Sequence, residues 1–178
     1  MKKLPSREQS EQLLRNYIRN EGLLNHCFMV ARAMEAYARE LSQDEELWYQ
    51  SGLLHDIDWE KYPDQHPLYA TSTILINYPD ELINAVLAHG PSITGRNPET
   101  LLERYLFACD EISGFINAVS LMRPTRFEGM EPKSVVKRLK DKSFAAKVSR
   151  EDITMGCVLI QKELTDHIAF LIGVFERK

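Results

Sequence analysis

Apolar residues recur at three- and four-residue spacing along most of this chain, and this pattern restricts the fold more than any other feature. Between residues 25 and 41, Val30, Met34, Tyr37 and Leu41 would form one stripe of a helix. Strands would instead alternate apolar and polar residues, with Asn-Gly or Asp-Gly turns between them, and the sequence has neither feature. The sequence therefore predicts an all-α protein built as a single helical bundle.

Capping residues, prolines and glycines divide this pattern into helices. Ser6 and Gln9 predict a capping box, Gly22 a break after the first helix, and Asn97 a cap before Pro98. Pro67 and Pro79 suit first helical positions. The predicted helices cover approximately residues 6–18, 25–41, 44–55, 67–78, 80–89, 98–121, 132–147 and 149–178, with a loop at 91–97.

Length and composition fit one globular domain that spans residues 1–178. The chain is 44% hydrophobic and 27% charged, and 22 basic against 26 acidic residues leave a formal net charge of −4. This charge argues against a surface that wraps a nucleic acid. No apolar stretch approaches the roughly 20 residues that span a bilayer, and the start lacks the apolar stretch of a secretory signal. We therefore expect neither nucleic acid nor a membrane as a partner.

The chain has three cysteines, Cys27, Cys109 and Cys157. Their number is odd, and no two of them are separated by only two residues. This usage is typical of reduced thiols in a cytoplasmic protein.

The histidines carry the strongest functional signal. His55 and Asp56 end an apolar helical stretch, where an imidazole and a carboxylate can both bind one divalent ion. Helices 67–78 and 80–89 would form a hairpin of similar arms, so His66 and His89 should meet at one end. At a helix N-terminus, His66 should also stay neutral, as metal binding requires.

Two further residues could complete a metal site. His26 would open one helix and His55 would close the next, so both could lie at the same end of that pair. Asp110 lies in the middle of an otherwise apolar helix, where a buried carboxylate needs a compensating partner such as a metal ion.

The ordered set of His26, the pair His55-Asp56 and Asp110 resembles the HD superfamily of metal-dependent phosphohydrolases, which are helical bundles. His66 and His89 look like the two additional histidines of its two-metal branches. The resemblance covers residues 26–115. A looser resemblance extends over residues 123–148 of the basic helical C-terminal part, 123–178, and looks like the tail of uncharacterised bacterial members. It implies one or two divalent ions, iron or manganese or similar, bridged by Asp56. Many members carry glycine where this sequence has Asp58.

The implied reaction is metal-assisted hydrolysis of a small phosphorylated compound, a nucleotide or related phosphoester. Besides Asp56, the candidate catalytic residues are Asp58 and Lys61, which follow the ligands closely and could handle a proton or a phosphate oxygen. Arg123 is the candidate substrate-binding residue. It begins a segment, 123–150, with nine basic and three acidic residues, whose net charge of +6 could attract phosphate.

Two other functions fit the same residues. Six nitrogen and oxygen ligands around two ions also suit a di-iron oxygenase, which occurs among rare relatives with this helical scaffold. A non-catalytic binding or regulatory module could retain the same metal site. The sequence leaves the substrate, the metal and the oligomeric state open.

Overall fold

The computed structural model describes residues 2–177, and its regular elements are helical. No strand occurs in this range, and none of its helices is both long and apolar enough to cross a membrane. The α-helices are α1 (Arg7–Tyr17), α2 (Glu21–Glu40), α3 (Glu45–Leu54), α4 (Asp80–Ala88), α5 (Pro91–Thr94), α6 (Leu101–Leu121), α7 (Pro132–Leu139), α8 (Arg150–Leu159) and α9 (Leu164–Glu176). A 3₁₀ turn, Pro63–Gln65, and a π turn, Ala70–Ile74, lie between α3 and α4. The predicted all-α class is confirmed.

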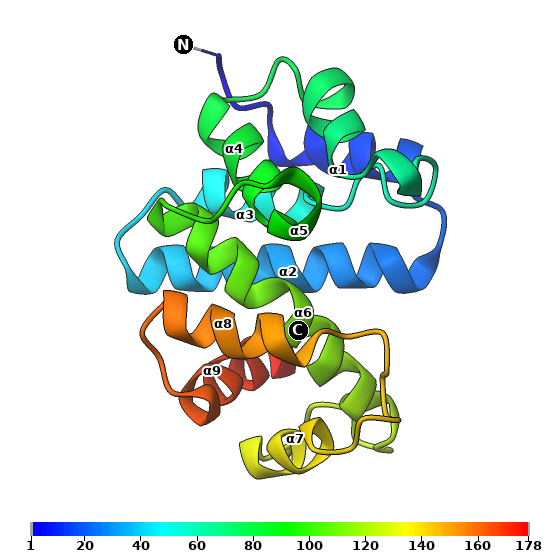
Figure 1. Ribbon diagram of the computed structural model, residues 1–178, viewed down its shortest axis with the longest axis vertical. Helices are drawn as coiled ribbons and strands as arrows, with labels where there is room; N and C mark the ends of the chain where they lie inside the picture. The colour runs from blue at the N-terminus through cyan, green and yellow to red at the C-terminus, as the bar shows by residue number, and fades with distance from the viewer. Residues whose placement is uncertain (1, 178) are drawn as a thin grey trace.

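Helix α2 crosses the middle of the molecule, with α1, α3 and α4 on one side and α7, α8 and α9 on the other (Figure 1). Helix α6 passes α2 and contacts elements on both sides, among them α4, α8 and α9. The buried apolar residues form two clusters that follow this division. One involves α1, α2, α3, α4 and the segment between α3 and α4, and the other involves α2, α6 and the C-terminal helices.

Two glycines bring helix pairs into close contact. A Cβ on Gly52 of α3 would lie 2.9 Å from the Ala31 backbone of α2, and a Cβ on Gly156 of α8 would lie 2.8 Å from the Cα of Ala108 in α6. Such separations leave no room for a side chain. The backbones of α2 and α3, and of α6 and α8, therefore approach as closely as glycine allows, which fixes the relative positions of the side chains these helices carry.

Several predicted helix boundaries are confirmed by their caps. Ser6 and Gln9 form the capping box at α1, and the side chains of Asp44 and Ser149 cap α3 and α8. Each accepts a backbone N–H that has no partner within the helix. The end of α6 at Leu121 also agrees with the prediction.

Two predicted starts were wrong because a better cap lies nearby. Helix α2 begins at Glu21, since the Asn20 side chain accepts the Leu23 N–H, and Gly22 lies inside its first turn. Helix α6 begins at Leu101 because Thr100 and Glu103 form a reciprocal capping box.

The predicted helix 67–78 is shorter and less regular than expected. Pro67 follows a cis peptide bond, and helical residues cover only 68–74, where Leu68 and Tyr69 lead into a π turn closed by the bond from Leu75 N–H to Ala70 O at 2.8 Å. The hydroxyls of Thr71 and Ser72 donate to backbone carbonyls of the preceding turn. Such bonds compete with regular helix formation, which explains why the helix is shorter than the pattern predicts.

The C-terminal part contains more breaks than predicted. Helix α7 stops at Leu139, because the Asp141 side chain accepts from Ser143 and Phe144 and makes a turn. The predicted final helix is two helices, α8 and α9, separated by a turn in which Gln161 has a φ of 54°. The predicted loop at 91–97 contains the single turn α5, which ends at Gly95 in the left-handed region.

Candidate metal centre

Six side chains from five parts of the chain converge between α2, α3, α4 and α6. They are His26 in the second turn of α2, His55 and Asp56 at the end of α3, His66 just before the π turn, His89 at the end of α4, and Asp110 in the middle of α6. They form two groups, each with ligand atoms within 4.8 Å of one another: His26, His55 and Asp110, and Asp56, His66 and His89.

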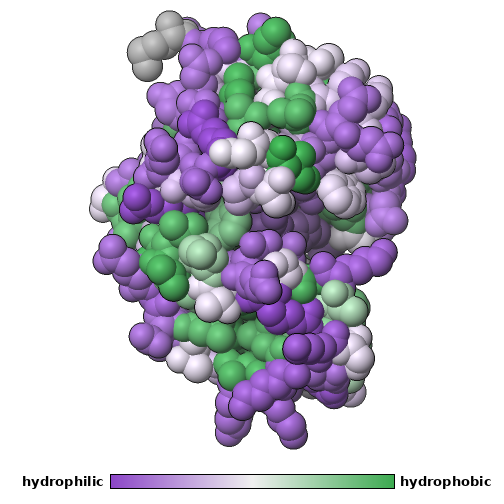
Figure 2. Space-filling view, in the orientation of Figure 1, coloured by the Kyte–Doolittle hydropathy of each residue, from purple (hydrophilic) through white to green (hydrophobic). Residues whose placement is uncertain are grey.

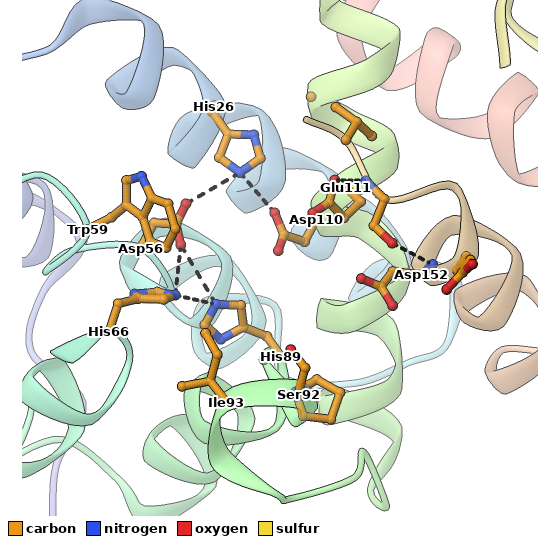
Figure 3. Close-up of a pocket in the computed structure, with 16 residues that line it drawn as sticks. His26, Asp56, Trp59, His66, His89, Ser92, Ile93, Asp110, Glu111 and Asp152 are labelled. Atoms are coloured by element: carbon orange, nitrogen blue, oxygen red, sulfur yellow. Dashed lines mark hydrogen bonds and ion pairs between the residues drawn. The ribbon is translucent and has the colours of Figure 1, made fainter. Parts of the chain in front are cut away.

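The Nε2 atoms of the histidines face one another within each group. His26 Nε2 lies 3.2 Å from His55 Nε2 and 2.9 Å from Asp110 Oδ1, and His66 Nε2 lies 3.1 Å from His89 Nε2. Figure 3 shows His66 and His89 side by side below Asp56, with His26 and Asp110 on its other side.

Asp56, a member of the second group, lies next to the first group as well and presents one oxygen to the histidines of each. Its Oδ2 lies 3.4 Å from His55 Nε2 and 3.8 Å from His26 Nε2. Its Oδ1 lies 3.5 Å from His66 Nε2 and 3.7 Å from His89 Nε2. A carboxylate in this position can contribute an oxygen to two neighbouring sites at once.

Three of the four imidazoles have a fixed orientation, because their Nδ1 atoms are engaged elsewhere. His55 Nδ1 donates to Gly52 O at 2.7 Å, His89 Nδ1 donates to Val86 O, and His66 Nδ1 pairs with Asp58 Oδ1 at 2.7 Å. With the proton on Nδ1, each neutral ring turns an Nε2 lone pair toward the cluster.

This arrangement fits a metal. The Nε2 atoms of His66 and His89 both point into a buried position, with 4% of each side chain exposed, and two lone pairs cannot hydrogen-bond to each other. A proton or a cation between them removes the conflict. Imidazole nitrogen and carboxylate oxygen are ligands for zinc, iron, manganese and similar divalent ions.

The charges within the cluster support the same conclusion. Burial opposes ionisation of Asp56 and Asp110, but the neighbouring histidines outweigh it and hold the pKa of both carboxyls well below the usual value. Burial also opposes the charged form of His55, yet Asp56 and Asp110 raise its pKa well above the ordinary value. The carboxylates therefore stay ionised, and a metal would displace the proton that His55 otherwise carries.

Residues 23–114 match the family described as the HD domain. The chain belongs to the HD domain family. No curated protein and no solved structure matches the sequence. HD domains bind divalent metals and are typically metal-dependent phosphohydrolases, and the matched segment contains all six residues of the cluster.

The cluster of this HD domain opens onto a cavity of about 580 Å³. Besides five cluster residues, its walls come from the loop after Asp56, from α5, from α6 and from the start of α8. These other lining residues are Trp59, Gly90, Pro91, Ser92, Ile93, Glu111, Gly114, Val148, Ser149, Glu151 and Asp152. Figure 2 shows a hollow between the upper and lower halves of the corresponding face, surrounded largely by hydrophilic residues.

The structure brings together the six predicted ligands, but one reason given for them was wrong. His26 lies in the second turn of α2 instead of opening it. His66 does precede helical residues, 68–74, whose first bond runs from Thr71 N–H to Pro67 O, but this segment is much shorter than the predicted helix. His66 and His89 nevertheless lie side by side, because the chain leaves His66 through the π turn and α4 brings it back to the same place at His89.

Asp58 was predicted as a catalytic residue, and its position does not agree with that role. Its side chain is fully buried and does not line the cavity. One oxygen pairs with His66 Nδ1, and the other accepts the Ala70 N–H at 2.7 Å. Asp58 therefore orients His66 and joins it to the π turn.

Lys61 and Arg123 also lie away from the cavity. Lys61 is exposed, donates to Asn16 O and lies over the Tyr17 ring, because the loop after Asp56 returns across the end of α1. Arg123 donates to Arg126 O and Glu128 O and thereby closes the loop after α6, roughly 20 Å along the helix from Asp110. The predicted catalytic and substrate-binding roles of these two residues are not supported.

The wall residues near α8 were missed by the sequence analysis. Ser149 and Asp152 signalled only a helix cap, which they form, and Glu111 was hidden beside Asp110. Burial, Asp110 and Asp152 raise the pKa of Glu111 to about 7, although its Oε2 accepts the Ser149 N–H. Nothing local in the sequence places α8 opposite the cluster, because the α6–α8 contact brings together residues about 40 positions apart.

The buried cysteines and His167 have packing roles. The three cysteines are free and buried, and burial raises the pKa of each thiol, which keeps it protonated. His167 accepts from Tyr37 at Nδ1 and donates to Ala108 O at Nε2, so it satisfies polar groups in the core.

Proposed function

We propose that this HD domain is a phosphohydrolase that hydrolyses a small phosphorylated compound, a nucleotide or related phosphoester, with one or two divalent ions held by the six-residue cluster. The observation that supports it best is the position of Asp56, with one oxygen toward each group of ligands. Bound divalent ions lower the pKa of a coordinated water and neutralise charge on phosphoryl oxygens.

The residues of the cluster and of the cavity wall would have different roles in this reaction. His26, His55 and Asp110 would hold one ion and His66 and His89 the other, with Asp56 shared between them. Asp58 would keep the His66 ring in place. Glu111 lines the cavity beside Asp110, and its Oε2 accepts the Ser149 N–H, so it would join the start of α8 to the wall next to the metal ligands. The cavity is large enough for a small phosphoester and its leaving group.

A panel of phosphoesters, with manganese, cobalt, nickel or iron added in turn, tests this proposal. We expect release of inorganic phosphate that depends on one of the metals and is lost in Asp56→Ala. Asp64→Ala is the matched control, because Asp64 is an exposed acid in the following turn and has no place in the cluster. Loss of activity in both variants, or no phosphate release with any metal, would refute the proposal.

The two other functions, a di-iron oxygenase and a binding module, predict different experimental outcomes. The oxygenase is favoured by four imidazoles and two carboxylates around two ion positions, and predicts oxygen consumption by the reduced iron form with a polyol or phosphonate. The binding module predicts a ligand-induced rise in melting temperature without any product.

A further inference from the structure

The wall of the cavity opposite the histidines is acidic. Glu111, Glu151 and Asp152 line it beyond Asp110, and no lysine or arginine is among the cavity-lining residues of the described chain. Figure 3 shows Glu111 and Asp152 on the side of Asp110 that faces away from the histidines. This wall offers carboxylates to the leaving group of a substrate seated at the cluster.

The basic residue in the first turn of α8 does not line the cavity. Arg150 lies between Ser149 and Glu151 in sequence, but its guanidinium donates to the carbonyls of Ala145 and Val148 and to those of Asp141 and Phe144. Arg150 thus closes the loop before α8. The +6 charge of segment 123–150 consequently supplies no lining cation to the cavity.

The N-terminus of α8 points at the cavity but is already occupied by the protein's own acceptors. The Ser149 N–H donates to Glu111 Oε2 at 3.0 Å, and the Ser149 hydroxyl accepts from Asp152 N–H at 3.1 Å. An anion would normally be attracted to such a helix end, yet here the acidic side chains of Glu151 and Asp152 lie in its first turn. This wall therefore disfavours a second phosphate group and favours a positive charge.

We propose that the substrate is a phosphate monoester whose leaving group carries a positively charged nitrogen, and that Glu151 and Asp152 determine this specificity. The inference rests on the proposed function, because it assumes that the phosphoryl group sits at the His/Asp cluster. Carboxylates accept strong hydrogen bonds from an ammonium group, and these bonds discriminate against an uncharged group of the same shape. Nucleoside diphosphates and triphosphates would place further negative charge beside the same carboxylates.

A pair of non-hydrolysable ligands tests this specificity by binding alone. In 3-aminopropylphosphonate and butylphosphonate the phosphonate end is the same, and an ammonium group in one replaces a methyl group in the other. Calorimetric titration of the protein supplied with Mn²⁺ should give a dissociation constant about tenfold or more lower for the amine, as expected for hydrogen bonds to a charged group. ADP should bind more weakly than the amine.

The double variant Glu151→Gln with Asp152→Asn should reduce this preference to less than about threefold. The control is Asp166→Asn, which also removes an acidic residue from the first turn of a helix, α9, but lies outside the cavity. It should keep the full preference for the amine and show whether loss of first-turn charge alone has any effect.

Equal binding of the two phosphonates, binding of neither, or tighter binding of ADP would overturn the inference. A preference that persists in the double variant would overturn the assignment to Glu151 and Asp152. Failure of the proposed function is a separate result: the binding preference would be present, but no phosphoester would be hydrolysed with any metal.

Discussion

The substitution Asp58→Asn isolates the part of the site that orients a ligand without touching the cavity. The Asp58 carboxylate is fully buried and accepts two bonds of 2.7 Å, from His66 Nδ1–H and from the Ala70 N–H. Asparagine keeps the shape but offers only one acceptor oxygen, so one of these buried donors loses its partner. We expect a loss of about 1–3 kcal/mol in the free energy of unfolding.

The effect on metal binding should be confined to one group of ligands. His66 belongs to the group with His89 and Asp56, and loss of such a carboxylate partner typically weakens metal binding by about 10- to 100-fold. The hydrogen bonds and ion pair of the Asp58 side chain go to His66 and Ala70, and not to His26, His55 or Asp110. We therefore expect titration of Asp58→Asn with Mn²⁺ to show one site close to wild-type affinity and one weakened site.

Tyr78→Phe provides the control for stability. It removes a buried hydroxyl that contacts Ser10 at 2.9 Å, so it should also lower the unfolding free energy, by about 1 kcal/mol, without altering either metal site. Equal weakening of both sites in Asp58→Asn, or unchanged affinity at both, would refute the orienting role. So would the same metal-binding defect in Tyr78→Phe.

Three further predictions concern the rest of the molecule. Burial lowers the pKa of His167 from 6.5 to about 4, so that on acidification the unfolded chain takes up a proton on this residue before the folded protein does. The contribution of neutral His167 to the unfolding free energy should be complete above pH 6.5 and fall by about 3 kcal/mol toward pH 4. Chemical unfolding at several pH values should show that the unfolding free energy depends less steeply on pH in His167→Gln. Gly52→Ala should cost about 1–3 kcal/mol in unfolding free energy, because its Cβ would overlap the Ala31 backbone, and thermal unfolding measures this loss. Lys61→Ala and Arg123→Ala should leave metal content and phosphate release within about twofold of wild type, whereas a tenfold loss would restore the roles that their positions argue against.

The ligand set was accessible to sequence reasoning because each ligand sits where a local signal occurs. His55 and His89 are at helix ends that the chain marks clearly, and Asp110 is a charged residue in an apolar helix. The backbone structure between His66 and His89 could not be predicted from such signals. There the side-chain hydroxyls of Thr71 and Ser72 and the carboxylate of Asp58 compete for backbone groups, and helical periodicity does not report such bonds.

The cavity wall could not be predicted for a different reason. Glu111 and Asp152 lie on helices joined by the close contact of Gly156 with Ala108, which is a long-range packing choice. Lys61 and Arg123 show the converse error, since proximity in sequence to a ligand or to a basic segment did not translate into proximity in space. The side chains of Lys61 and Arg123 point toward the backbone carbonyls to which they donate, and loop structure decides where these carbonyls lie.

Metal content per chain tests the central claim most directly. Protein purified without chelator and analysed by elemental mass spectrometry should contain up to two equivalents of a divalent transition metal, and Asp56→Ala should lose most of it because both groups share this carboxylate. Asp64→Ala should keep the wild-type content. A wild-type protein that binds no metal even when manganese, iron, cobalt or nickel is supplied, or an Asp56→Ala variant with unchanged metal content, would contradict the account.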